Sequence, residues 1–130
     1  MSLTVITLDH FILKVNDIKT SVDFYTSILG FTNGGQDGPF TVVRVNSAFQ
    51  IQLAPWGTLG GEHYAFAVSM RQFNQIFDRI KLAEIEYGPS YDSVGSNTGS
   101  GTEIGAKGPG PTLYFFDPNK HLLEIRTYEK

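Results

Sequence analysis

The sequence contains no cysteine, and this absence removes a whole group of mechanisms. A chain without thiols has no thiolate zinc ribbon, no redox CxxC pair and no cysteine nucleophile. The side chains left to carry chemistry are those of His, Asp, Glu and Tyr. Disulfides are typical of oxidising compartments, so a cysteine-free chain fits a cytoplasmic location, which we expect for this protein.

The sequence also lacks any run of Lys and Arg, and its formal charge at pH 7 is −3. Because phosphates are bound by clusters of basic side chains, we expect no nucleic acid and no anionic membrane as a partner. No apolar stretch reaches the roughly 18 residues of a membrane-spanning helix, and the N-terminus has no leader-like pattern. The length suits a single domain, residues 1–130, that buries a core without disulfides.

One order of predicted elements recurs in two modules, which span approximately residues 4–56 and 61–129. Alternating apolar residues predict strands, and apolar residues at helical spacing that follow a capping residue predict helices. The elements of the first module are a strand over residues 8–15, a helix that Asn16 or Asp17 caps and Gly30 ends, and a hairpin of residues 40–45 and 48–53.

The second module repeats this order, which indicates a duplication. Its elements are a strand over residues 63–68, a helix capped by Ser69 with apolar positions Phe73, Phe77 and Ile80, and a hairpin of residues 112–116 and 121–128. Each module has room for one more short strand that the pattern does not place. Residues 87–111 are rich in Gly, Ser, Pro, Asp and Asn without apolar periodicity, which predicts a long loop, either a functional lid or a disordered connection.

Two of the three histidines occupy equivalent points of the two modules. His10 opens the first strand and His63 opens its counterpart, while Glu124 lies in the final strand. Either histidine alone would most simply be a surface residue or a hydrogen-bonded core residue. Two imidazoles at repeated positions, together with a carboxylate, are instead the ligand set of a divalent metal ion. We therefore expect His10, His63 and Glu124 to bind a metal.

The period-2 alternation of the strands sorts their side chains onto two faces. One face of each module is apolar and should pack against the helix. The other face carries the three expected ligands, and a curled sheet would gather them in a polar pocket. The further residues that we expect to line this pocket and bind substrate are Tyr114, Gln52, Arg44 and Arg126. The simpler alternatives are that Tyr114 is a packed aromatic and that the two arginines are ion-paired or solvated.

On these residues the chain resembles the vicinal oxygen chelate superfamily, which contains glyoxalase I, fosfomycin resistance thiol transferases, bleomycin resistance proteins and extradiol dioxygenases. The matching segments extend over nearly the whole chain. They are Leu8-Asp9-His10-Phe11, Asp17-Ile18, Phe24-Tyr25-Thr26-Ser27-Ile28-Leu29-Gly30-Phe31, His63-Tyr64-Ala65-Phe66, Tyr114-Phe115-Phe116-Asp117-Pro118 and His121-Leu122-Leu123-Glu124-Ile125.

The resemblance implies an α+β fold in which two βαβββ modules form a cupped mixed sheet with the helices on its outer face. It implies metal ligands at His10, His63 and Glu124. It also implies a homodimer in which each metal site takes ligands from both subunits.

The activity that we favour from this resemblance is divalent-metal-dependent and glyoxalase-like, of the lyase or isomerase type or of the thiol transferase type. A small substrate would chelate Mn, Ni, Zn or Fe(II) through two neighbouring oxygens. Glutathione or another thiol would be the cosubstrate of a transferase, and Glu124 could double as the general base. Fosfomycin is disfavoured as the substrate, because Ile12 stands where the thiol transferases carry threonine.

Two alternatives stay open. The same three ligands could hold Fe(II) in an extradiol-type dioxygenase. The chain could also be a noncatalytic small-molecule binding protein, as the bleomycin resistance proteins are.

Overall fold

The computed structural model describes residues 6–129, so the start expected for the first module, at residue 4, lies outside the described residues. The chain divides into two compact units, Met1–Thr58 and Leu59–Lys130. The boundary falls between the two predicted modules.

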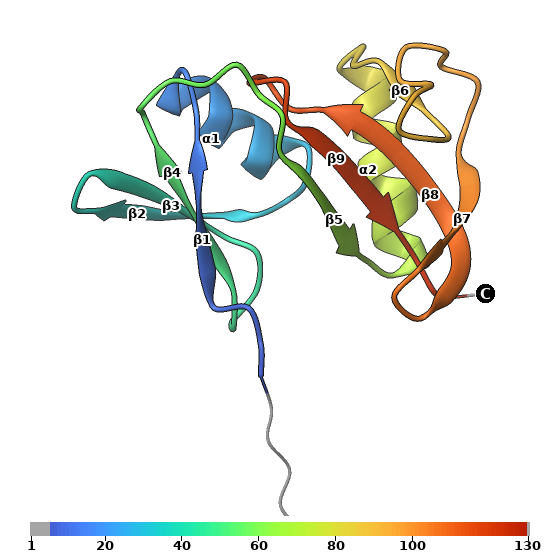
Figure 1. Ribbon diagram of the computed structural model, residues 1–130, viewed down its shortest axis with the longest axis horizontal. Helices are drawn as coiled ribbons and strands as arrows, with labels where there is room; N and C mark the ends of the chain where they lie inside the picture. The colour runs from blue at the N-terminus through green and yellow to red at the C-terminus, as the bar shows by residue number, and fades with distance from the viewer. Residues whose placement is uncertain (1–5, 130) are drawn as a thin grey trace, which may run out of the picture. The chain divides into compact units, whose positions relative to one another are not determined.

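The described part of the first unit consists of one helix and a four-stranded sheet (Figure 1). Its elements are β1 (His10–Lys14), α1 (Ile18–Ser27), β2 (Thr32–Asp37), β3 (Phe40–Arg44) and β4 (Gln50–Ala54). The strand order is β1-β4-β3-β2, with β1 parallel to β4 and the other pairs antiparallel. The first strand of the unit therefore lies beside its last.

The second unit has the same plan. Its elements are β5 (His63–Ala67), α2 (Met70–Leu82), β6 (Tyr87–Gly88), β7 (Gly101–Gly105), β8 (Gly108–Phe116) and β9 (Leu122–Arg126). The order is β5-β9-β8-β6, with β5 parallel to β9, while β7 pairs with β8 outside this path. Two βαβββ modules of the predicted α+β class are thus present, and β7 is an addition to the second.

Both helices begin at capping side chains that the sequence predicts. Asp17, rather than Asn16, caps α1, since its carboxylate accepts a hydrogen bond of 2.8 Å from the backbone N–H of Thr20. This bond lowers the pKa of Asp17. At the start of α2, Ser69 accepts from the backbone N–H of Gln72 while the Gln72 side chain accepts from that of Ser69. This reciprocal capping box fixes where α2 begins.

The strands have the two faces that their alternation predicts. In β1, Leu13 is buried on the helix side, whereas His10 and Ile12 are exposed on the other. In β9 the residues of both faces are buried. The helix side of β9 holds Leu123 and Ile125, and the opposite side holds Glu124 and Arg126. Burial of charged residues on this second face marks the part of the sheet where polar interactions are concentrated.

The helix α2 packs somewhat differently from the prediction. Phe73 and Ile80 are buried as expected, and Ile76 joins them. Phe77 is half-buried and packs edge-on against Tyr87, with ring centroids 5.0 Å apart. The buried stripe is therefore rotated slightly from the predicted one.

The prediction of an irregular loop over residues 87–111 is wrong, because β6, β7 and the first part of β8 lie within it. β7 pairs with β8 from Gly101 opposite Thr112 to Gly105 opposite Gly108. Glycine is a poor strand former, so the backbone ladder to β8 and not the local pattern defines this strand. In the first unit, β2 is the short strand that the pattern did not place.

Candidate metal centre

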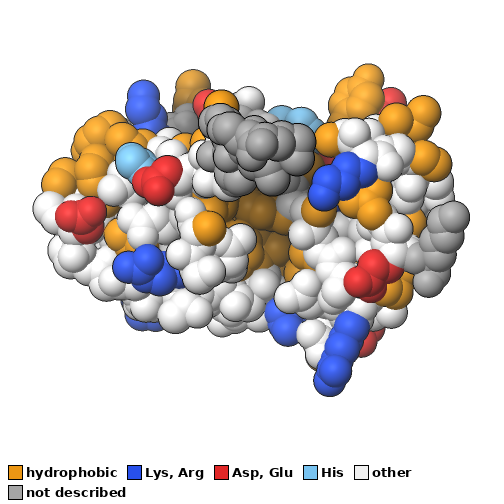
Figure 2. All heavy atoms as spheres, turned by 90° about the horizontal axis from the view of Figure 1, so that it is seen from below, with side chains coloured by type: hydrophobic (Ala, Val, Ile, Leu, Met, Phe, Trp, Pro, Cys, Tyr) orange, Lys and Arg blue, Asp and Glu red, His pale blue; other side chains and the backbone are white. Residues whose placement is uncertain are grey.

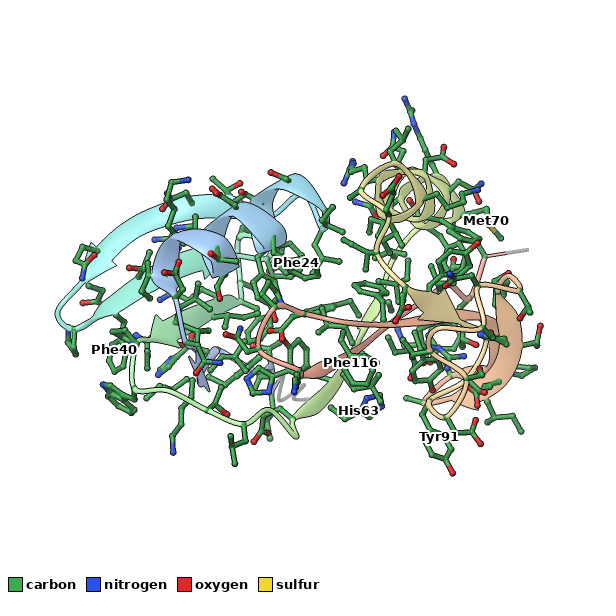
Figure 3. The ribbon with its side chains drawn as sticks, turned by 90° about the horizontal axis from the view of Figure 1, so that it is seen from above. Phe24, Phe40, His63, Met70, Tyr91 and Phe116 are labelled. Carbon is green, nitrogen blue, oxygen red and sulfur yellow. The ribbon has the colours of Figure 1, made fainter. Side chains whose placement is uncertain are left out.

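His63 and Glu124 lie next to each other on adjacent strands of the second unit. β5 and β9 are parallel with Ala65 opposite Glu124, and His63 lies two residues before Ala65 on the same face. The Nε2 atom of His63 is 3.7 Å from Oε1 of Glu124. The Glu124 side chain is 8% exposed and that of His63 is 48% exposed, so the imidazole, which projects from β5 in Figure 3, is open to solvent. Two of the three expected ligands are thus brought together.

Both expected histidine ligands are oriented by a bond at Nδ1. The Nδ1 atom of His63 is 3.3 Å from the carbonyl oxygen of Leu122, and since a carbonyl only accepts, Nδ1 donates. The Nδ1 atom of His10 is 2.7 Å from the carboxylate of Asp9, which makes Nδ1 the donor there too. In each case the lone pair of the neutral ring is left on Nε2. A metal-binding histidine typically has this arrangement, in which the other ring nitrogen donates to a carbonyl or carboxylate.

Tyr114 stands beside this pair on β8, directly opposite Glu124. Its ring stacks on the His63 imidazole, with centroids 5.8 Å apart and planes 12° apart. Burial, together with the neighbouring carboxylates of Glu124 and Glu103, raises the pKa of the Tyr114 phenol far above its ordinary value. The hydroxyl therefore keeps its proton at neutral pH and serves as a hydrogen-bond donor rather than a base.

Arg126 is an ion-pair partner of Glu124. Its Nη1 donates to Oε2 of Glu124 at 3.2 Å, and both side chains are less than a tenth exposed. This agrees with the simpler alternative for Arg126, an ion-paired side chain. Glu103 of β7 also belongs to this cluster, and its Oε1 is buried without a hydrogen-bond partner in the described structure. Sequence reasoning missed Glu103 because it lies in the stretch without periodicity.

The other expected residues lie in the first unit. The register places Gln50 opposite both His10 and Arg44, so these three side chains are neighbours on one face. A pocket of about 180 Å³ adjoins them, and it is lined by Asp9, Arg44, Ser47, Ala48, Phe49 and Gln50. Gln52 donates to the carboxylate of Asp37 at 3.4 Å. Arg44 has no ion pair within residues 6–129.

The residues present fit a divalent ion in their chemistry. His63 and Glu124 supply an imidazole nitrogen and a carboxylate oxygen close enough to share one cation, and the tautomer of His63 is the binding one. Among the described residues, neither unit by itself gathers three His, Asp or Glu side chains around one point. The participation of His10 thus stays a prediction. The third histidine, His121, is 1% exposed and accepts from the backbone N–H of Glu62, which is a structural role.

Equivalent residues of the two modules occupy the same register positions in the two sheets. In the first unit, Gln52 lies opposite the residue that follows His10 by two positions. In the second, Glu124 lies opposite the residue that follows His63 by two positions. Gln52 is therefore the counterpart of Glu124. The two modules therefore have two pairs of equivalent positions. One pair holds two imidazoles, and the other holds a carboxylate and a neutral amide.

Two repeated βαβββ units that each present a histidine at the start of the first strand are the architecture of the glyoxalase fold. The chain belongs to the glyoxalase/bleomycin resistance protein/dioxygenase superfamily, whose family model matches residues 7–125. Proteins of this superfamily are commonly dimers that bind small molecules. A metal-dependent enzyme or a small-molecule binding protein of this superfamily is the function class that follows.

Solved structures of similar proteins have the same fold. The oxidase ChaP-H2 is 31% identical with a TM-score of 0.80, over 97% of this chain and 96% of that one. The oxidase ChaP-H1 is 28% identical with a TM-score of 0.78, over 96% and 98%. The fosfomycin resistance protein FosX from Listeria monocytogenes, solved with Mn(II) and a dihydroxypropylphosphonic acid, is 20% identical with a TM-score of 0.69, over 95% and 90%. The similarity to FosX shows the shared fold.

On the face shown in Figure 2, Lys and Arg side chains of the described residues are scattered among apolar and acidic ones. In residues 6–129, no helix has both the length and the apolar character needed to cross a membrane.

Proposed function

We propose that this protein is a metal-dependent enzyme that oxidises a small substrate bound to the metal through two neighbouring oxygens, with His10, His63 and Glu124 as the metal ligands. The observation that carries the proposal is the His63–Glu124 pair, because its Nε2 and Oε1 atoms are 3.7 Å apart and Nδ1 of His63 is held as a donor. FosX, with the same fold, binds Mn(II). Two histidines and one carboxylate also suit Fe(II).

The ligand count favours oxidation over isomerisation. A bound ion would act as a Lewis acid toward the substrate oxygens. Because Gln52 stands where the repeat would place a second carboxylate, the chain offers three strong ligands and not four. An amide oxygen is a weaker ligand for Fe(II) than a carboxylate, and Gln52 already donates to Asp37. Held by only three protein ligands, a bound ion would have room for both a two-oxygen substrate and O₂, as in the facial-triad oxygenases.

The oxidases ChaP-H1 and ChaP-H2, at 28% and 31% identity, support the same reaction class. The environment of Glu124 supports a ligand role as well. Its Oε2 is bound by Arg126 while Oε1 faces His63. A carboxylate that Arg126 holds at one oxygen is suited to stay on a metal through the other oxygen rather than to leave it and act as a general base. Tyr114, which keeps its proton, would donate a hydrogen bond to a substrate oxygen at the metal.

The remaining expectations follow from the superfamily and from the proposed set of metal ligands. A homodimer would let His10 of one subunit complete the His63–Glu124 pair of the other. Arg44 and Gln52, near His10, would contact the substrate. The cytoplasm is the expected location, because the chain has no cysteine.

The test is reconstitution of metal-depleted protein with Fe(II), Mn(II), Ni(II) or Zn(II), followed by O₂ consumption with catechols and hydroxylated aromatics. We expect about one ion per chain, as one ligand triad per chain implies, and O₂ uptake with Fe(II) alone. His63→Ala should remove both the metal and the activity, whereas Gln75→Ala on the exposed face of α2 should change neither.

Other outcomes would select the other functions of the superfamily. Conversion of glutathione hemithioacetals with Ni(II) or Zn(II), without O₂ uptake, would indicate glyoxalase-type isomerisation. Opening of epoxides by a thiol would indicate a transferase. Wild-type protein that binds no divalent ion would leave a noncatalytic binding protein and refute the proposal.

A further inference from the structure

The Arg126 guanidinium is enclosed on several sides by the β7–β8 hairpin and by the end of the chain. Nη1 donates to Oε2 of Glu124. Nη2 donates to two backbone carbonyls of the hairpin, those of Glu103 at 3.0 Å and Gly108 at 3.2 Å. The face of the guanidinium lies over the Tyr128 ring, 4.7 Å from its centroid. Few orientations of this side chain are compatible with all four contacts.

The tip of the hairpin is shaped to admit this side chain. Gly105 and Gly108 pair with each other at the end of the ladder, and Gly108 has a positive φ of 108°. A Cβ atom at position 105 would overlap the guanidinium of Arg126 and the hydroxyl of Tyr128. That hydroxyl accepts from the backbone N–H of Lys107 at 3.3 Å. Glycine at 105 is therefore a condition for the place that Arg126 occupies.

We propose that Arg126, held by the tip of the β7–β8 hairpin, is a positioning residue that fixes the Glu124 carboxylate for metal binding. The inference rests on the proposed role of Glu124 as a ligand. The tip of the hairpin is bonded to Arg126 through the carbonyls of Glu103 and Gly108, so Arg126 links this tip to Glu124, while Tyr114 of β8 lies directly opposite Glu124. The strand β7, which the second module has and the first lacks, thus helps to orient the side chain of Glu124 on β9.

Two effects of Arg126 on metal affinity oppose each other. Its positive charge repels a cation and takes up part of the negative charge of Glu124, which weakens binding. Its hydrogen bond holds the carboxylate in one orientation, which strengthens binding. Loss of such a partner of a metal ligand typically costs about 10- to 100-fold in affinity. We expect orientation to dominate, because Arg126 is itself fixed by two carbonyls and a ring.

The sign of the change in affinity therefore tests the inference. Mn(II) is titrated into metal-free full-length protein, and free Mn(II) is measured by electron paramagnetic resonance. Arg126→Lys keeps the charge but cannot make the forked contacts of a guanidinium, and Arg126→Met removes both. Gly105→Ala displaces Arg126 without changing it. The matched control is Gly101→Ala in the same strand, whose Cβ would press on Pro89, 2.6 Å from its carbonyl oxygen, and not on Arg126.

We expect Arg126→Lys, Arg126→Met and Gly105→Ala each to weaken Mn(II) binding about 10- to 100-fold and Gly101→Ala to leave it within about twofold. Circular dichroism and thermal unfolding of the metal-free variants separate affinity from folding, and Arg126→Lys and Gly105→Ala keep the test open if Arg126→Met does not fold. Unchanged Mn(II) affinity in Arg126→Lys, or tighter Mn(II) binding in Arg126→Met, would overturn this inference but not the proposed function. Wild-type protein without Mn(II), Fe(II), Ni(II) or Zn(II) affinity would overturn the proposed function and this inference together.

Discussion

Replacing Glu124 by glutamine in the metal-free protein should measure how strongly the buried ion pair stabilises the second unit. Glutamine keeps the length and one oxygen acceptor of glutamate but removes its charge. The Arg126 guanidinium, which is 6% exposed in the pair, then stays buried without its ion-pair partner. A buried charge that loses its partner typically destabilises a protein by about 3–5 kcal/mol.

The structure places the expected loss at the lower end of that range. At the Nη1–Oε2 distance of 3.2 Å, the Coulomb attraction is about 5 kcal/mol with an effective dielectric constant of about 20. The amide oxygen of the variant still accepts a hydrogen bond from Arg126, which offsets about 1–2 kcal/mol. The two carbonyls of Glu103 and Gly108 also remain as acceptors. We therefore expect the free energy of unfolding to fall by about 3 kcal/mol, or roughly 10–15 °C in Tm for a chain of this size.

The assay is urea unfolding of the metal-free wild type, Glu124→Gln, Arg126→Met and the double variant at pH 7 and equal protein concentration. Because the double variant leaves neither charge unpaired, it should be more stable than the sum of the two single losses predicts, by about 2–3 kcal/mol. Additive losses would show that the two side chains do not stabilise each other. A Glu124→Gln variant as stable as the wild type would refute the argument that the pair is buried and paired as described.

Two further predictions concern the neighbours of the ligands. Because the pKa of Tyr114 is raised, its phenol should not ionise near pH 10. The ultraviolet difference spectrum between the wild type and Tyr114→Phe should therefore show no phenolate at that pH. The stabilisation linked to this proton is present below the ordinary tyrosine pKa of about 10 and is lost as the pH rises through the folded value. Gln52→Glu would place a second carboxylate at the position equivalent to Glu124, so we expect divalent ions to bind about tenfold or more tightly while O₂-dependent turnover falls. Equal metal affinity in Gln52→Glu would argue against a shared site.

Most of the fold follows from interactions within a few residues of the chain. The alternation in β1 and β5 separates the helix face from the histidine face, and Asp17 and Ser69 cap the helices that the sequence predicts. The pairing of His63 with Glu124 could be predicted as well, because both lie on the polar face of their strands. These are consequences of period-2 geometry and local hydrogen bonds, which a sequence displays directly.

The surroundings of Glu124 could not be predicted in this way. β7 is Gly-Thr-Glu-Ile-Gly, and its apolar residue Ile104 points to solvent while Glu103 turns inward. Its pattern is thus the reverse of an ordinary half-buried strand, so periodicity gives no signal or a misleading one. Only pairing with β8 and the contact of its backbone with Arg126 explain why Glu103 is where it is. Such contacts between distant residues are set by tertiary structure.

The duplication clarifies why the second unit carries the more elaborate site. Positions equivalent by register are Gln52 and Glu124, and one step further along the same face, Ala54 and Arg126. A neutral amide needs no buried counter-charge, so the first unit can place alanine there. A buried carboxylate does need one, and the arginine that provides it needs acceptors of its own, which the β7–β8 hairpin supplies. The buried charge of Glu124 is therefore matched in the second module by Arg126, by the glycine that leaves room for it and by the hairpin that supplies its acceptors.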